Sequence, residues 1–396
     1  MKVQKFKLLD YLNSVFEGID LDDYHVICVQ HIVASTISLF NALFENGLNP
    51  KNLSAIGKCY STRPEALEHL LEKNVDVAQE SLHFNPYRTF DMGFRRVLLS
   101  FFREKIKSLE IKGCKKLIVL DDGGELLLFM NALLKKNKFW RGKVVGIEQT
   151  TAGYDKLKSE SILLPIINVA RSNIKLFHES PFIARIAVER LLEHLNKLRI
   201  FPKNALIIGN GAIGSHIHSE IRELFRTEMF DLDSSKSSIK NDSCAAILGN
   251  FDLIIGCTGK TVIHPNQFRF LKRGVCLVSV SSSDREFSGF NLRSKVKNIS
   301  SCHQDICSSG IHLLNCGFPI NFDDAYEEID IPEFQLTRAI LLSGIYQSIT
   351  KEHANGLIDL DSDLQEKIYH LYDQTFFPST PVLKAIRRKG CHSAAV

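Results

Sequence analysis

The residues best placed to do chemistry are the glycines of a mid-chain turn, in the run Asn204-Ala-Leu-Ile-Ile-Gly-Asn-Gly-Ala-Ile-Gly214. In this G-x-G-x-x-G spacing Gly209 allows a tight turn, Gly211 lets a pyrophosphate approach the backbone, and Gly214 permits close helix packing. The helix expected over 215–225 would begin at that phosphate. The turn predicts a dinucleotide site; the plainer alternative is an α/β turn with incidental glycines.

Acidic residues follow the turn where a dinucleotide site needs a carboxylate. The segment 228–233 is expected to form the next strand, which places Asp231 or Asp233 about 20 residues beyond the turn. A carboxylate at that position holds the ribose 2′-hydroxyl of NAD and favours NAD over NADP. We therefore expect NAD as the cofactor.

Strand and helix patterns alternate on both sides of the turn. Short apolar runs predict strands at 25–29, 53–57, 116–120, 143–147, 252–255 and 274–279. Helical patterns occupy 32–46, 125–135, 181–197, 334–349 and 361–372. This alternation predicts an α/β fold with two doubly wound parallel sheets, joined by the helix at 181–197.

Composition indicates a globular protein with room for two domains. The chain has 396 residues, of which 44% are hydrophobic and 24% charged. Its net charge of +4 is scattered until the basic segment 384–389, which we interpret as solvated, so neither a nucleic-acid nor a membrane partner is expected. Residues 1–20 lack the pattern of a signal peptide. Ten cysteines without C-x-x-C pairing favour a reduced, cytoplasmic protein.

Four segments upstream of the turn carry a more specific pattern. They are Gln30-His31, Leu120-Asp-Asp-Gly-Gly-Glu125, Glu148-Gln-Thr-Thr-Ala-Gly153 and Ile167-Asn-Val-Ala-Arg-Ser-Asn-Ile-Lys175. In order and type they resemble S-adenosylhomocysteine hydrolase. Downstream segments resemble that family as well: Cys257-Thr-Gly259, Asp284-Arg-Glu286 and Leu313-Leu-Asn315. The resemblance covers roughly residues 25 to 320.

The resemblance implies a substrate domain interrupted by a Rossmann domain. The substrate domain begins with residues 1–185, the NAD-binding Rossmann domain spans 186–318, a helical return to the first domain spans 319–375, and a tail spans 376–396. It also implies a small nucleoside-type substrate, bound NAD and a homo-oligomer, either dimer or tetramer. The C-terminal Lys and Tyr that reach a neighbouring subunit in the family have no clear counterpart here, which weakens the expectation of a tetramer.

The resemblance also implies a reaction and its residues. NAD oxidises the ribose 3′ carbon, the ketone acidifies the 4′ proton, the 5′ thioether is eliminated, water adds, and the sugar is reduced again. Lys175, paired with Glu179, is expected to act on the 3′-hydroxyl, while Asp122 and His31 handle protons at the 4′ and 5′ carbons. The remaining implied contacts are Ser61, Thr62, Gln149 and Phe318 for the substrate, and Thr150, Thr151, Gly209, Gly211, Ala212, Ile213, Gly214, Asp231, Asp233, Thr258, Gly259 and Asn315 for NAD. No metal is expected.

Each candidate has a structural alternative. His31 could be a hydrogen-bonded group at a strand end, and Asp121 or Asp122 could cap the following helix. Lys175 could be an ordinary surface lysine. Thr150 and Thr151 could simply end a strand.

Several positions depart from the family. Gln149 stands where a glutamate grips the ribose hydroxyls, and Val33 and Ser35 replace two groups that read adenine. Others are Gly317-Phe-Pro319 for a Gly-His-Pro segment, Ser282 for a histidine, Ser180 for an asparagine and Ala184 for a cysteine. Loss of hydrogen-bonding partners disfavours adenine. Three functions therefore stay open: a hydrolase of this type, a dehydrogenase of a sugar or hydroxy acid, and a catalytically inactive NAD-binding scaffold.

Overall fold

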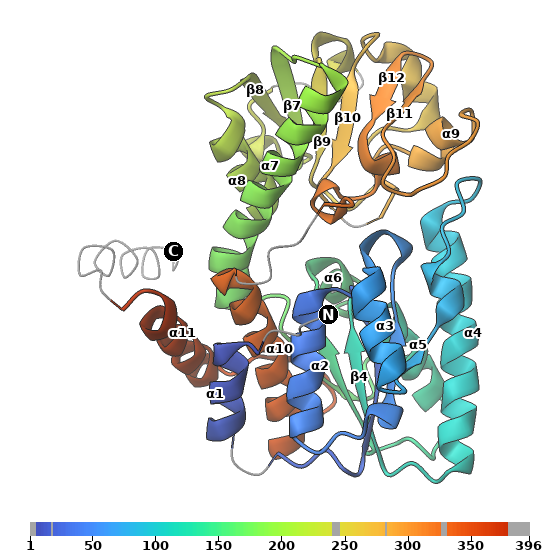
Figure 1. Ribbon diagram of the computed structural model, residues 1–396, viewed down its shortest axis with the longest axis vertical. Helices are drawn as coiled ribbons and strands as arrows, with labels where there is room; N and C mark the ends of the chain where they lie inside the picture. Colours follow the sequence, from blue (N-terminus) through green and yellow to red (C-terminus); the bar gives the residue numbers. More distant parts are fainter. Residues whose placement is uncertain (1–4, 17–18, 240–245, 282, 326–330, 379–396) are drawn as a thin grey trace.

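The computed structural model describes residues 5–16, 19–239, 246–281, 283–325 and 331–378. In this part of the chain the strands form two separate sheets. Figure 1 shows them as two lobes, with the long helix α7 (Ser180–Leu198) running from one to the other.

The first sheet is parallel throughout its described strands and has the order β13-β6-β5-β4-β1-β2-β3. Its strands are β1 (Tyr24–Val29), β2 (Leu53–Ile56), β3 (Asp76–Val77), β4 (Lys116–Asp121), β5 (Val144–Glu148), β6 (Pro165–Asn168) and β13 (Gly356–Asp359). On one side of β1 lie β2 and then β3, and on the other side lies β4, followed by β5 and β6. The topological switch therefore lies between β1 and β4, and ligands of such sheets bind at the carboxyl ends of the strands there.

The second sheet repeats this arrangement, in the order β11-β12-β10-β9-β7-β8. Its strands are β7 (Asn204–Ile208), β8 (Arg226–Phe230), β9 (Leu253–Gly256), β10 (Cys276–Ser279), β11 (Ile306–Ser308) and β12 (Ile311–Leu313). The switch lies between β7 and β9. The prediction of two doubly wound sheets is confirmed, except that β11 pairs antiparallel with β12 at one edge.

Helices cover both faces of the first sheet because successive strand residues point to opposite sides. Val26 and Cys28 of β1 pack in one core, whereas Ile27 and Val29 pack in the core on the other face. The helices over the first face are α1 (Lys7–Val15), α2 (Ala34–Glu45), α3 (Pro64–Glu72), α10 (Pro332–Thr350) and α11 (Ser362–Phe376). Those over the second are α4 (Phe90–Ile111), α5 (Glu125–Leu134) and α6 (Thr151–Leu157).

The second lobe is layered in the same way. Ile207 and Ile255 pack against α7 and α8 (Ala212–Ile221), while Leu206 and Ile254 face the core that includes α9 (Gly289–Arg293). The alternating strand residues thus supply both apolar faces.

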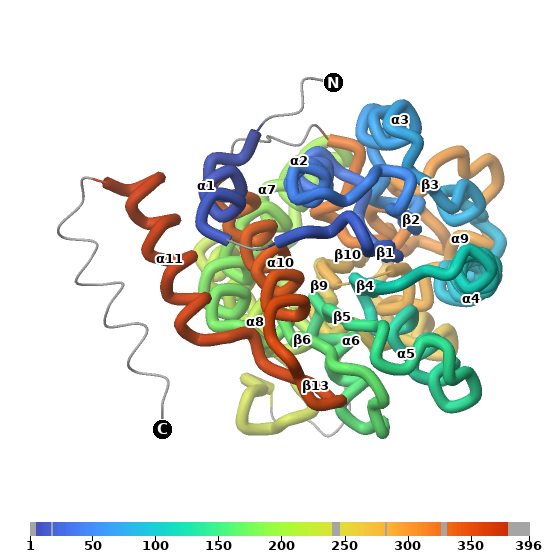
Figure 2. Tube along the Cα trace, turned by 90° about the horizontal axis from the view of Figure 1, so that it is seen from below, coloured from blue at the N-terminus to red at the C-terminus, as the bar shows by residue number. Residues whose placement is uncertain are grey.

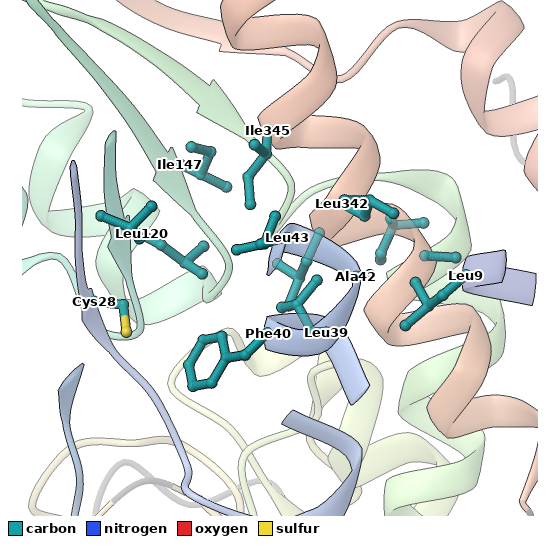
Figure 3. Packing of buried hydrophobic residues seen from close by; sticks show 14 of the residues in the cluster. Leu9, Cys28, Leu39, Phe40, Ala42, Leu43, Leu120, Ile147, Leu342 and Ile345 are labelled. Carbon is teal, nitrogen blue, oxygen red and sulfur yellow. The ribbon is translucent and has the colours of Figure 1, made fainter. Parts of the chain in front are cut away.

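The chain returns to the first lobe after β12, and α10 inserts beside α1 and α2 (Figure 2). In Figure 3, Leu342 and Ile345 of α10 lie close to Leu43 of α2 and Ile147 of β5. A Cβ atom at Gly344 would lie 2.8 Å from the Val169 side chain, so this glycine allows the close approach of α10. Helix α1 and helices α10 and α11, which lie far apart in the described sequence, therefore pack in the core of the same lobe.

Some expected elements need correction. The return was expected to be helical, but it also contributes strand β13, which pairs with β6. Helix α8 begins at Ala212, inside the glycine motif, rather than at Ser215. Ser282 and the tail residues 379–396, with the basic segment 384–389, lie outside the described residues. Within the described ranges, no helix combines the length and apolarity needed to cross a membrane.

Candidate active site

His31 and Asp122 come together at the switch point of the first sheet. His31 lies just beyond the carboxyl end of β1, and Asp122 immediately follows β4, the neighbouring strand. His31 Nε2 lies 3.1 Å from Asp122 Oδ2, and His31 Nδ1 lies 2.5 Å from Ser61 Oγ. Its ring stacks on Phe322, with 4.2 Å between centroids. The structure therefore forms a Ser61–His31–Asp122 hydrogen-bonded chain.

Lys58 completes this chain, and the sequence analysis missed it. Its Nζ lies 2.9 Å from Asp122 Oδ1 and also donates to the Asp122 backbone carbonyl, at 3.3 Å. The residue is only 5% exposed. Its position just beyond strand β2 was the available signal, because β2 is the other neighbour of β1.

The charges in this cluster shift one another's pKa values. Burial opposes ionisation of Asp122, yet Lys58 and then His31 hold its pKa well below the usual range. Burial likewise opposes the charge on Lys58, but Asp122 raises the pKa of that amine. Burial lowers the pKa of His31 despite the neighbouring Asp122. The arrangement favours an ionised Asp122, a charged Lys58 and a neutral His31.

Gln149 links this cluster to Lys175. The Gln149 amide donates to Asp122 Oδ2 at 2.8 Å and accepts from Gln30 Nε2 at 2.8 Å. Lys175 Nζ donates to the Gln149 backbone carbonyl at 2.7 Å and lies 2.9 Å from Glu179 Oε2. The structure thus brings all four predicted catalytic residues into one connected network.

The Lys175–Glu179 pair lies in a single turn of π-helix (η4) at the start of α7. The expected pairing of Lys175 with Glu179 is present, at a spacing of i, i+4 that would also suit an ordinary α-helix. Such wide turns are rare and occur frequently at functional sites. The π turn places this ion pair at the lobe junction, where α7 begins.

Asp121 and Glu148 lie beside the network and have structural roles. Asp121 Oδ2 accepts from the Leu127 amide at 2.9 Å, so the capping alternative applies to Asp121 and not to Asp122. Glu148 Oε1 accepts from the amide and hydroxyl of Thr150, at 2.8 and 2.6 Å. Burial raises the pKa of Asp121 to about 6, and burial followed by Asp121 raises that of Glu148 well above its usual range.

The predicted threonines open helix α6. Thr150 caps it by accepting from the Gly153 amide at 3.1 Å, and exposed Thr151 is its first residue. Both lie just after β5, on the carboxyl edge of the sheet.

The glycine turn follows β7, at the switch point of the second sheet. Gly209 has φ +101°, which favours glycine. A Cβ atom at Gly214 would lie 1.9 Å from the Gly209 carbonyl oxygen, whereas a Cβ at Gly211 would meet nothing within 4 Å. Ala212 and Ile213 form the first turn of α8, and no side chain caps that helix end. The open space at Gly211 and the uncapped amides fit a pyrophosphate.

The two acidic candidates beyond the turn are distinct in the structure. Asp231 accepts from the Asn210 amide at 2.7 Å, so its carboxylate lies against the glycine turn. Asp233 is exposed and caps its own short turn by accepting from Ser235. Asp231 is therefore the better placed of the two to hold a ribose.

The remaining predicted NAD contacts already make hydrogen bonds within the protein. Thr258 and Gly259 follow β9, and both donate backbone amides to Glu286 Oε1, at 2.6 and 3.2 Å. Asn315 is buried, and its amide donates to the Pro319 carbonyl at 2.8 Å while its oxygen contacts His303. The Asn315 side chain thus stabilises the turn around it.

The predicted substrate residues lie in two places. Ser61 contacts His31, and the adjacent Thr62 hydroxyl donates to the Lys58 carbonyl at 2.9 Å. Phe318 instead lies in an aromatic cluster between the lobes, 1% exposed, stacked on Tyr60 at 4.8 Å. Tyr60 also contacts His31 edge-on, so this cluster borders the network. The sequence analysis did not single out Tyr60 or Phe322.

Further contacts across the lobe boundary are polar. Arg285 pairs with Asp91 at 2.7 Å, and the Phe90 amide donates to Asp284 at 3.3 Å. Arg285 also contacts the Gly259 carbonyl, so the loop after β9 lies at this boundary. In the described part of the chain, no group of three His, Cys, Asp or Glu residues is arranged to hold a metal ion.

Comparisons with known proteins give one family relationship. No family model matches the chain. The uncharacterized proteins MT0113 and Rv0104 of Mycobacterium tuberculosis, from strains CDC 1551 / Oshkosh and H37Rv, are each 34% identical over 372 residues, which cover 90% of this chain and 72% of the relative.

Solved structures give only distant likenesses. Dipicolinate synthase A chain from Bacillus subtilis is 9% identical with a TM-score of 0.37, over 84% of this chain and 97% of that chain. NAD+-bound 3-phosphoglycerate dehydrogenase from Entamoeba histolytica is 10% identical with a TM-score of 0.37, over 84% and 100%. Nothing about activity follows from scores this low.

Proposed function

We propose a function for this chain, which belongs to the same family as the Mycobacterium tuberculosis protein Rv0104. The proposed function is that of an NAD-dependent enzyme similar to S-adenosylhomocysteine hydrolase. It oxidises a ribose 3′-hydroxyl and cleaves a 5′ thioether by elimination and hydration. We also propose that residues 1–185 and 319–375 serve the substrate and residues 186–318 serve the cofactor.

One observation carries the proposal. His31, Asp122, Gln149 and Lys175 come from four separate segments, yet they form one hydrogen-bonded network at the carboxyl edge of the first sheet. The resemblance assigns these same positions to the reaction. Structural residues chosen at random would not be expected to meet at the switch point of a doubly wound sheet.

The glycine turn fits NAD in its shape and charge. Gly211 leaves space for the pyrophosphate, and Asp231 presents a carboxylate beside the turn. NAD, when bound, supplies the hydride acceptor and donor for the sugar carbon. The other steps depend on side chains of the first lobe.

In the first lobe, Lys175 and His31 each handle a different proton of the substrate. Lys175 is oriented by the Gln149 carbonyl, passes one proton to the Glu179 carboxylate, and then takes the proton of the 3′-hydroxyl at its Nζ. The resemblance has both Asp122 and His31 handle protons at the 4′ and 5′ carbons. We propose instead that His31 exchanges the proton at the 4′ carbon and that Asp122, which already accepts three donors, orients its ring. Aromatic rings of Tyr60, Phe318 and Phe322 exclude water from the boundary around His31.

We propose that the substrate is a nucleoside thioether. We expect its base to make different hydrogen bonds from those that the family makes to adenine. Val33 and Ser35 stand where the family has base-reading groups, and the Ser35 hydroxyl contacts Arg338 at 2.9 Å. A site that lacks its hydrogen-bonding partners discriminates strongly against the ligand that needs them.

A second candidate is an NAD-binding scaffold without turnover, and Gln149 favours it. Both ends of its amide are engaged within the protein, by Gln30 and by Asp122. The amide therefore has less capacity to grip ribose hydroxyls than a carboxylate at that position. A dehydrogenase that releases NADH would use the same Lys175 and glycine turn.

Cofactor identification and a lysine variant test the proposal. The purified protein is denatured, the released nucleotide is identified, and thiol release from S-adenosylhomocysteine and related nucleoside thioethers is measured. We expect NAD and thiol release, with Lys175→Ala lowering the rate at least about a hundredfold because a proton-transfer group is lost.

Lys158→Ala is the matched control, since Lys158 is half-exposed and pairs only with nearby Asp155 among its described salt bridges. NAD without turnover of any thioether would favour the scaffold, and net formation of NADH would favour the dehydrogenase. Equal rates for Lys175→Ala and wild type would remove the proposed role of Lys175.

A further inference from the structure

Asp122 already accepts three side-chain donors from within the protein. Its Oδ1 accepts a hydrogen bond from Lys58 Nζ at 2.9 Å. Its Oδ2 accepts from the Gln149 side-chain amide at 2.8 Å and lies 3.1 Å from His31 Nε2. Three donors on one buried carboxylate stabilise its ionised form. A carboxylate bound in this way orients other groups better than it accepts a proton.

Lys58 is the component that the resemblance does not supply. It is buried at the centre of the site, and its ammonium group is compensated by Asp122. A buried lysine without a partner would lose its charge, so the two groups hold each other ionised. Lys58 therefore determines the charge that His31 meets at Asp122.

The charge on Asp122 fixes the tautomer of His31. A carboxylate can only accept, so the proton of neutral His31 lies on Nε2. The lone pair then lies on Nδ1, which accepts from the Ser61 hydroxyl at 2.5 Å. Nδ1 is consequently the basic atom, with Ser61 as its neighbour.

We propose that Lys58 is a positioning residue, which holds Asp122 ionised so that His31 keeps its Nε2–H tautomer and exchanges the substrate proton through Nδ1. This inference deepens the proposed function and rests on it. The proton leaves the 4′ carbon for Nδ1, directly or through the Ser61 hydroxyl, and returns to the same carbon later in the turnover. The protein gains and loses one proton, so none is consumed.

Other titratable or charged groups face the cluster from each neighbouring element. Asp121 is the last residue of β4, and Glu148 is the last residue of β5. Tyr60 lies after β2, and Arg338 lies on α10. Lys156 of α6 acts on Asp121. Only Lys58 and Gln149 share Asp122 with His31 among the described hydrogen bonds, so Lys58 is the cation to remove.

The test is NMR of the full-length protein labelled at the histidine rings, with the His31 signal assigned by its loss in His31→Gln. In the wild type, we expect a neutral His31 with the proton on Nε2 at neutral pH. In Lys58→Met, a protonated His31 is the remaining cation beside the Asp122 carboxylate, so the His31 titration should move upward by roughly one pH unit or more. Lys58→Arg, which keeps the charge, should restore the wild-type titration.

Lys156→Met is the matched control, because it removes a cation from the same edge of the sheet without touching Asp122. If Lys58→Met does not yield folded protein, Lys58→Gln removes the charge and keeps a donor. An unchanged His31 titration in either variant would overturn the inference, as would an upward shift in Lys58→Arg equal to that in Lys58→Met.

Because the NMR experiment needs no substrate, its failure differs from failure of the proposed function. Where thioether cleavage is observed, the His31 limb of the pH–rate profile should move upward in Lys58→Met by the same interval and return in Lys58→Arg. A profile that loses only amplitude would indicate a purely structural role and would contradict the inference.

Discussion

At the scale of single residues, Gly211 and Gly214 have opposite surroundings. Gly214 is packed against the Gly209 carbonyl, so a side chain there would disturb the turn itself. Gly211 has extended backbone angles, φ −85° and ψ −169°, and open space where a Cβ would stand. The fold therefore needs a glycine at position 214, whereas only a bound ligand needs a glycine at position 211.

This difference predicts separable effects of two alanine substitutions. Gly211→Ala should keep the melting temperature of the ligand-free protein but weaken NAD binding on the order of tenfold or more, since its methyl group takes space needed by the pyrophosphate. Gly214→Ala should lower the melting temperature. Scanning calorimetry with and without NAD measures both effects.

Gly93→Ala on α4 is the control, because a Cβ there meets nothing within 4 Å and alanine favours a helix. Undiminished NAD binding by Gly211→Ala would contradict the assignment of the pyrophosphate site.

Residue types and motifs in the sequence predicted some residues of the site but not all of them. The sequence named His31, Asp122, Lys175 and Glu179, which the structure brings together, because their motifs are local. It could not separate Asp122 from Asp121, since only the hydrogen bond to Leu127 shows that Asp121 is the cap. Lys58 was missed because its partner lies 64 residues away and burial of a lysine depends on that partner.

At the scale of elements, α7 is tied to the returning chain by a buried charge cluster. His194 of α7 lies 2.7 Å from Asp305 Oδ2 and 3.0 Å from Asp323 Oδ2. Arg190, one turn earlier, also pairs with Asp323. The cluster joins both connections between the lobes. No local pattern indicates it, because its basic residues on α7 lie more than 100 residues before their acidic partners.

The cluster predicts a pH-dependent stability. Burial opposes the charge on His194, but the hydrogen bonds that it donates to Asp305 and Asp323 raise its pKa to about 9. Since this exceeds the unfolded value of about 6.5, the stabilisation is fully present below pH 6.5 and is lost as pH rises through about 9. Its size is on the order of 3 kcal/mol.

His194→Gln should lower the melting temperature at pH 6 and flatten its decline between pH 6.5 and 9. His216→Gln on α8 is the control. If both variants show the same decline as the wild type, the ion pairs of His194 do not stabilise the junction.

The elements themselves were mostly accessible from sequence, for a physical reason. Parallel strands covered on both faces form short apolar runs, such as Val26 to Val29, and these are easy to recognise. Strand β13 was missed because, at the edge of the sheet, three of its four residues are only half-buried and Asp359 is exposed. The π turn was missed because its spacing also suits an ordinary helix.

At the scale of the whole molecule, the lobes meet through an aromatic cluster that borders the proposed site. Phe318 of the second lobe stacks on Tyr60 of the first and contacts Phe84 and Phe90 edge-on. The surface hollows lined by Asp20 and Lys116 and by Phe6 and Glu45 lie away from this boundary. In the proposed function, separation of these aromatic contacts would admit the substrate, as in other enzymes that close over their ligands.

Phe318→Ala should weaken the coupling between the lobes, at a cost of about 3–5 kcal/mol for a buried phenylalanine. Calorimetry should then show two transitions, or a broadened one, in place of a cooperative melt. Phe270→Ala is the control, because that ring is 44% exposed and its loss should change stability by less than about 0.5 kcal/mol. An unchanged melt for Phe318→Ala would mean that the ring does not join the lobes.

We propose that a ribose hydroxyl is oxidised beside the His31–Asp122–Lys175 network, with bound NAD as the hydride acceptor. Rapid mixing of NAD-loaded protein with a nucleoside thioether, followed at the absorbance band of NADH, tests it most directly. We expect a band that rises and then decays within one turnover, and that is absent in Lys175→Ala with the same NAD content. A protein that never takes up NAD, or whose band is the same in Lys175→Ala, would contradict it.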